Sequence, residues 1–139
     1  MKLRIFQTVD ELDAEFHRVE GCLQRVAESA ARGEFTAQDL LVLARRGDAV
    51  IGVIEGADDV VQMGFAMEFI RYPRFTALNV IALGGICMAT NMDLFWEGIK
   101  AFGKASGAQC IEASVSPAMA RMLGPYGFEA TYQQVRSTL

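Results

Sequence analysis

The chain has 139 residues, of which 52% are hydrophobic and 22% are charged, which argues against intrinsic disorder and predicts one folded domain over residues 1–139. A net charge of −4 with no long basic run argues against a nucleic-acid binder. The three cysteines and the single histidine are too widely spaced for a metal site, so we expect no bound metal and a reducing, cytoplasmic compartment.

Residues 75–92 form an uncharged stretch that is nearly long enough to cross a membrane. Asn79 and the adjacent pair Gly84 and Gly85 interrupt it, so we interpret it as a buried strand followed by a polar loop, and we expect no membrane association. The N-terminal residues alternate charged and apolar side chains without an apolar core segment, so we expect no secretory signal.

The first third of the chain predicts a strand and two helices. Residues 2–6 alternate in polarity, as a half-buried strand does. Thr8 and Glu11 have the spacing of a capping box and open a helix whose apolar residues recur in steps of three and four until Gly33. The same capping signal opens a second helix, over residues 36–47.

The middle of the chain predicts three strands and a helix. Residues 50–54, 60–70 and 75–83 are rich in β-branched and aromatic side chains, and their short connections predict antiparallel neighbours. Thr90 or Asn91 is the expected cap of the helix that follows.

The last third predicts a strand over 110–115, a short helix over 117–123 that Ser116 caps, and a final strand over 128–135. The helix between 75–83 and 110–115 allows these two strands to run parallel. The element order therefore predicts an α/β (α+β) domain with a mixed, largely antiparallel sheet and helices on both faces. We expect seven side chains to be buried in it: Phe16, Leu23, Ile81, Ile99, Phe102, Ile111 and Phe128.

Residues 120–129 read Ala-Arg-Met-Leu-Gly-Pro-Tyr-Gly-Phe-Glu. Together with the element order, this segment resembles the closing segment of the GNAT superfamily of N-acetyltransferases. Residues 85–139 are more loosely similar to small GNAT-like proteins encoded by tailed phages, which implies the host cytoplasm or the virion as the location. The resemblance implies a GNAT fold and, for an enzyme, acetyl-CoA as the cofactor.

GNAT enzymes bind the pyrophosphate of acetyl-CoA on backbone amides in a loop patterned Gln/Arg-x-x-Gly-x-Gly/Ala. The resemblance places this loop at residues 83–91, where no Gln or Arg precedes the glycines at the family spacing. A tight strand-to-loop turn is the alternative interpretation of these glycines. If the chain is an acyltransferase, the expected cofactor-binding residues are Ile81, Leu83, Gly84 and Gly85.

Charge around this loop is unfavourable for a phosphate. The chain has no basic residue between Arg74 and Lys100. Asp93 and Glu97 fall in the first turns of the expected helix, where they complement the helix dipole and would repel an anion.

The general acid of the GNAT family is a Tyr four residues before the Gly of Gly-Phe. Counting back from Gly127 gives Leu123, which has no proton to donate. Tyr126 is the nearby hydroxyl, and we expect it to pack at the joint between helix and strand or, as the weaker alternative, to act in catalysis.

Carboxylates are the candidates for a general base. Glu55, Glu68 and Glu112 lie in predicted strands, and a partly buried Glu can take a proton from an amine; strand alternation equally allows each to face solvent. Cys87 is either a reactive thiol activated by the following helix or a small buried residue.

Three functions fit these observations. The first is a GNAT-fold protein with degenerate acetyl-CoA and catalytic motifs, which serves as a structural or accessory protein, needs no cofactor, and works with a protein partner or as a homo-oligomer. The second is a CoA-dependent N-acetyltransferase that acts on an amine. The third is a small-molecule or peptide-binding module that uses the cleft between the fourth and fifth strands. A protein partner is expected at any apolar patch exposed around Phe95 and Trp96.

Overall fold

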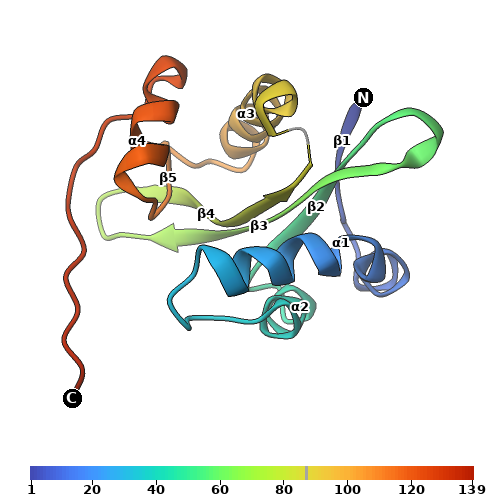
Figure 1. Ribbon diagram of the computed structural model, residues 1–139, viewed down its shortest axis with the longest axis horizontal. Helices are drawn as coiled ribbons and strands as arrows, with labels where there is room; N and C mark the ends of the chain where they lie inside the picture. The colour runs from blue at the N-terminus through green and yellow to red at the C-terminus, as the bar shows by residue number, and fades with distance from the viewer. Residues whose placement is uncertain (87) are drawn as a thin grey trace.

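A computed structural model describes residues 1–86 and 88–139 and shows one mixed sheet between two pairs of helices (Figure 1). Helices α1 (Val9–Ser29) and α2 (Ala37–Arg45) cover one face of the sheet. Helices α3 (Met88–Ala105) and α4 (Pro117–Leu123) cover the other face. This arrangement confirms the predicted fold class.

The strands follow one another across the sheet in chain order, β1-β2-β3-β4-β5. All neighbours are antiparallel except β4 and β5, which are parallel as predicted because α3 carries the chain back between them. Their bounds are Lys2–Ile5 for β1, Val50–Glu55 for β2, Val61–Arg71 for β3, Thr76–Gly85 for β4 and Cys110–Glu112 for β5. Two short 3₁₀ helices, η1 (Ala57–Asp59) and η2 (Gly124–Tyr126), complete the chain.

The predicted N-caps of three helices are confirmed. The Thr8 side chain accepts a hydrogen bond from the backbone N–H of Glu11 at 3.1 Å. Thr36 and Asp39 form both bonds of a capping box at the start of α2. Ser116 caps α4. These local bonds satisfy backbone donors that a helix start leaves free, which is why the sequence alone predicts where the helices begin.

Helix α3 does not begin where the sequence predicts. It starts at Met88, so neither Thr90 nor Asn91 is its cap. Asn91 lies inside the helix, is buried, and donates its side-chain amide to the carbonyl of Ile86 at 3.5 Å. A polar side chain that bonds back to the preceding loop resembles a cap in sequence, and this explains the error.

The predicted last strand, 128–135, is also wrong. Residues 128–139 have no regular secondary structure, and β5 ends at Glu112 instead of Val115. Tyr132 and Val135 are 94% and 89% exposed, and the segment runs away from the sheet (Figure 1). A strand needs a neighbour to satisfy its backbone, and among residues 1–86 and 88–139 no strand pairs with this segment.

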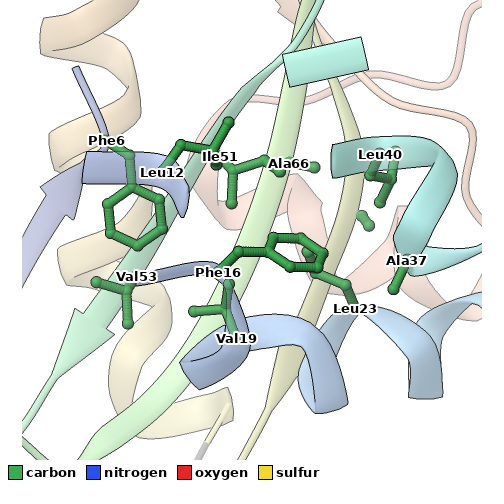
Figure 2. Packing of buried hydrophobic residues seen from close by; sticks show 11 residues of the cluster. Phe6, Leu12, Phe16, Val19, Leu23, Ala37, Leu40, Ile51, Val53 and Ala66 are labelled. Atoms are coloured by element: carbon green, nitrogen blue, oxygen red, sulfur yellow. The ribbon is translucent and has the colours of Figure 1, made fainter. Parts of the chain in front are cut away.

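Two hydrophobic cores lie on opposite faces of the sheet. Figure 2 shows the core beneath α1 and α2, in which Phe16, Val19 and Leu23 of α1 meet Ile51 and Val53 of β2. The core beneath α3 and α4 contains Met63, Phe65, Met67, Leu78, Val80, Met92, Phe95, Trp96, Ile99 and Leu123. We call them the α1-side core and the α3-side core.

The burial predictions hold in part. Phe16, Leu23 and Ile99 are buried, with exposed fractions of 4% or less. The other four side chains are half-buried and pack against one of the two cores: Ile81, Phe102, Ile111 and Phe128.

Phe95 and Trp96, around which a partner is expected at any exposed apolar patch, form no such patch. Both side chains are buried in the α3-side core, where their rings pack edge to face with centroids 4.7 Å apart. The two side chains face the sheet and the segment after α4, so neither ring is exposed to a partner. None of the helices in the described part of the chain is long and apolar enough to cross a membrane.

Candidate active-site fork

The parallel strands β4 and β5 separate at one defined point. Their paired residues are Ala77 with Cys110, Leu78 with Ile111, and Asn79 with Glu112. Beyond Asn79, strand β4 continues to Gly85, whereas the chain after Glu112 leaves the sheet for α4. Parallel strands that part at their carboxyl ends create the commonest ligand-binding position of open sheets. We call this place the fork.

Polar side chains form a row across three strands at the fork. Asn79 is the cross-strand partner of both Glu68 on β3 and Glu112 on β5, and directly paired residues point to the same face of a sheet. The Asn79 amide donates to Glu68 Oε2 at 3.0 Å. Two of the three predicted base candidates are therefore brought together, with Asn79 between them.

Glu112 has a second partner in Tyr72. The Tyr72 hydroxyl donates to Glu112 Oε1 at 2.6 Å, and this bond raises the pKa of Tyr72. Tyr72 follows β3 at the β3–β4 connection, and its ring lies 5.0 Å from that of Phe75. All members of the row are only partly covered, so a ligand at the fork would reach carboxylate oxygens.

The two faces of the fork differ in polarity. Leu78 and Val80 belong to the α3-side core, so Asn79 between them points to the α1 side. A bulge in β4 then adds one residue, Ile81, opposite β3, and both Ile81 and Ala82 pack against the α1-side core. The carboxylate row thus lies on the α1 side, whereas the α3 side of the fork is lined by apolar groups.

The four expected cofactor-binding residues do not share one face. Leu83 packs against the α3-side core, whereas Ile81 packs against the α1-side core. Gly84 is buried beneath α1, where a Cβ would lie 2.6 Å from Val26 Cγ2 and 2.9 Å from the Cys22 carbonyl oxygen. Gly85 has a φ of 149°, and a Cβ there would collide with the Gln62 backbone. Packing therefore accounts for glycine at both positions.

The start of α3 carries less negative charge than expected. Because the helix begins at Met88, its first turn contains no acidic residue, and Asp93 and Glu97 lie one and two turns further on. A helix dipole acts mainly within the first turn, so repulsion of an anion by these carboxylates is weaker than the sequence indicates. The expectations for Cys87 lie outside the described residues.

Leu123 and Tyr126 have different surroundings. Leu123 is 4% exposed and packs in the α3-side core. Tyr126 is half-buried and contacts α3, and no strand follows it to form the expected joint between helix and strand. Its hydroxyl donates to Asp93 Oδ1 at 2.8 Å, and this bond raises the pKa of Tyr126. Its carbonyl oxygen accepts a bond from Lys100 Nζ at 2.9 Å. These contacts tie η2 to the helix.

Glu55 does not have the properties of a general base. It is 2% exposed, and its two carboxylate oxygens accept bonds from Arg4 Nε and Arg18 Nη2, each at 2.8 Å. The bond from Arg4 lowers the pKa of Glu55 to about 2, so the carboxylate has little tendency to take a proton. Glu55 joins β1, β2 and α1 instead.

Two members of the row, Asn79 and Tyr72, were not among the predicted site residues. Their signal in the sequence is weak: a lone amide in an apolar strand and a Tyr before a Pro in a turn. Only the strand register brings them to Glu68 and Glu112. In the described residues, no group of three or more acidic, His or Cys side chains is arranged to hold a metal ion.

No protein-family model and no curated protein matches the chain. Solved structures match its fold. An acetyltransferase from Trypanosoma brucei has a TM-score of 0.69 at 12% identity and covers 99% of both chains. A ribosomal-protein-alanine N-acetyltransferase from Brucella melitensis has a TM-score of 0.71 at 10% identity and covers 100% of both. The aminoglycoside N-acetyltransferase AAC(6')-Iy, solved in complex with CoA, has a TM-score of 0.70 at 11% identity over 99% of this chain and 98% of that one.

At these identities the likeness shows the fold alone. The chain has the fold of the GNAT N-acetyltransferases, over its whole length, as its closing segment and element order implied. Fold by itself does not establish chemistry, because one fold supports many functions.

Proposed function

We propose that this GNAT-fold chain does not transfer acetyl groups and acts as a structural or accessory protein. The observation that carries the proposal is Leu123, which stands where the resemblance places the proton donor and is buried in the α3-side core. An isobutyl group cannot protonate a departing thiolate. The nearest hydroxyl downstream, on Tyr126, is already committed to Asp93.

The charges near the end of β4 and the start of α3, where the resemblance places the phosphate-binding loop, support the same proposal. The chain has no basic residue between Arg74 and Lys100, a range that includes the end of β4 and the start of α3. Each charge-assisted hydrogen bond to a phosphate is worth about 1.5 to 3 kcal/mol, so two missing bonds separate a micromolar cofactor from a millimolar one. The looser likeness to phage-encoded proteins makes the host cytoplasm or a virion the proposed location.

A CoA-dependent N-acetyltransferase is the second candidate, and the carboxylate row favours it. Glu68 and Glu112 lie at the fork on the face away from α3 and are partly accessible, as a base that receives an ammonium substrate must be. The acid-free first turn of α3 removes one objection to a phosphate there. AAC(6')-Iy, which shares the fold, was solved with CoA, and an enzyme of this kind would use acetyl-CoA.

Isothermal titration with acetyl-CoA separates the two candidates. We expect a dissociation constant weaker than about 10 μM, near −7 kcal/mol, or no heat at all. Tighter binding would overturn the proposal in favour of the acyltransferase.

A second experiment measures the release of free CoA from acetyl-CoA in the presence of a panel of amines and aminoglycosides. Glu112→Gln and Glu97→Gln serve as the matched pair, since Glu97 is exposed on α3 and away from the row. Turnover that Glu112→Gln abolishes and Glu97→Gln leaves unchanged would establish the enzyme. We expect no turnover above the rate in buffer with any of the three proteins.

A further inference from the structure

A groove lies between the C-terminal half of helix α3 and the beginning of strand β5. Its volume of about 370 Å³ falls in the range of about 300 to 1,000 Å³ that is typical of small-molecule sites. Its lining includes Lys100, Gly103 and Lys104 of α3, Cys110 and Ile111 of β5, and Phe128. The resemblance places the phosphate-binding loop at the opposite end of α3, and the fork opens at the opposite end of β5, so the groove is separate from both.

The charged side chains of this groove are both positive. Lys100 and Lys104 lie one helical turn apart on α3, and no carboxylate is among the described residues that line the groove. Neither lysine forms an ion pair in the described part of the chain, and Lys100 Nζ donates to the Tyr126 carbonyl oxygen at 2.9 Å. An ammonium group has three N–H donors, so both lysines retain donors for a ligand. In a chain with a net charge of −4, this local excess of positive charge favours an anion.

The remaining lining is mostly apolar. Ile111 and Phe128 are half-buried and pack against the α3-side core, so part of each side chain stays at the surface. Ala108 and Gly103 contribute small groups that leave space above them. The hydroxyl of Tyr126, which also lines the groove, is bonded to Asp93. An apolar lining with two cations is complementary to a ligand that has a hydrocarbon part and one acidic group.

We propose that this groove binds an aliphatic monocarboxylate of the medium-chain fatty acid type, with its carboxylate at Lys100 and Lys104 and its hydrocarbon chain along Ile111 and Phe128. One carboxylate can accept hydrogen bonds from both ammonium groups, because residues four apart lie on the same face of a helix. Burial of methylene groups against the apolar lining supplies the rest of the affinity. The binding is non-covalent and independent of whether the fork transfers acetyl groups.

Two native side chains report on the groove. Trp96 is the one tryptophan of the sequence, and its ring centroid lies 4.7 Å from that of Phe128 and 6.4 Å from that of Tyr126, both of which line the groove. A ligand against these two rings should therefore change the emission of Trp96. Cys110 is exposed in the groove, so a bound ligand should also slow its alkylation, which is measured by mass on the peptide that contains it.

The test is a titration of the full chain with decanoate, followed by Trp96 emission and by the alkylation rate of Cys110. We expect both signals to follow one saturating curve with a dissociation constant of about 100 μM, and decan-1-ol and decylamine to bind at least about tenfold more weakly. Hexanoate, which has four fewer methylene groups, should also bind at least about tenfold more weakly. Absence of saturation below about 1 mM, or decylamine that binds as tightly as decanoate, overturns the proposal.

Variants locate the site. Lys104→Gln should weaken decanoate binding by about threefold and the double variant Lys100→Gln with Lys104→Gln by about tenfold, whereas Lys2→Gln on the opposite edge strand β1 should leave it unchanged. All three lysines are exposed, so far-UV circular dichroism should show the wild-type fold in each variant. Equal affinity of the double variant and the wild type overturns the proposal. Protection of Cys110 before decanoate is added, in a chain that sediments as a dimer, would show that a second copy covers the groove and would also overturn it.

Discussion

Gly64 of β3 lies directly opposite Gly84 of β4, and both face helix α1. A Cβ at Gly64 would lie 3.0 Å from Val19 Cβ, and one at Gly84 would lie 2.6 Å from Val26 Cγ2. Together the two glycines let α1 lie close to the sheet beside the fork. Of the two, the sequence connects only Gly84 with phosphate binding, and the close approach of α1 accounts for glycine there.

Gly84→Ala should lower the free energy of unfolding by about 1 to 3 kcal/mol, because the new methyl group would overlap Val26 and the Cys22 carbonyl. Urea unfolding followed by circular dichroism measures the loss. Gly107→Ala is not a fair control because its φ is positive, whereas Gly124→Ala has open space and a helical φ. Equal stability of Gly84→Ala and the wild type would show that α1 moves freely away from the sheet.

Protonation of Glu55 at low pH should lower the free energy of unfolding. Hydrogen bonds from Arg4 and then Arg18 lower the pKa of Glu55 from 4.5 to about 2, so the folded state holds its proton less tightly than the unfolded chain does. The stabilisation is complete above about pH 4.5 and is lost as the pH falls toward 2, a difference of about 3 kcal/mol.

Glu55→Gln should flatten this dependence between pH 5 and 2, because an amide does not titrate there. Unfolding in urea at several pH values checks it, with the exposed Glu97→Gln as the control that keeps the wild-type slope. An acid slope unchanged by Glu55→Gln would place the main titrating group elsewhere.

Phe95 should matter more to stability than Phe102. Phe95 is fully buried between Phe65 and Trp96, with ring centroids 5.1 and 4.7 Å away, so Phe95→Ala should cost about 3 to 5 kcal/mol. Phe102 is half-buried and faces Phe69 at 6.0 Å, so its truncation should cost about 1 to 3 kcal/mol. Thermal and urea unfolding of the two variants give the order, and the reverse order would contradict the packing described for α3.

Leu123→Tyr should destabilise the fold and create no acetyl transfer. Leu123 is 4% exposed in the α3-side core, so the larger ring and its hydroxyl should cost about 1 to 3 kcal/mol. Unfolding and CoA-release assays on the same preparation test both parts. Turnover in this variant would mean that the fork already binds acetyl-CoA and lacked only the acid. Leu123→Met, which keeps the volume and has no hydroxyl, is the matched control.

The sequence by itself determined the order of helices and strands as far as α4, the three N-caps and the fold class. These features depend on neighbouring residues: Thr8 caps the amide of Glu11, and Thr36 caps that of Asp39. Hydrophobic periodicity acts over the same short range, so α1, α2 and the three antiparallel strands were predictable from residues close together in the chain.

Only the tertiary structure decided how distant residues meet. The strand register brings Glu68, Asn79 and Glu112 into one row, and a bulge at Ile81 turns the following residues of β4. Helix α3 starts at Met88, and Asn91 is buried inside it with a bond to Ile86, a contact that the sequence does not reveal. The last predicted strand failed for the same reason: residues 128–135 have the composition of a strand, but a strand forms only where another edge supplies its hydrogen bonds.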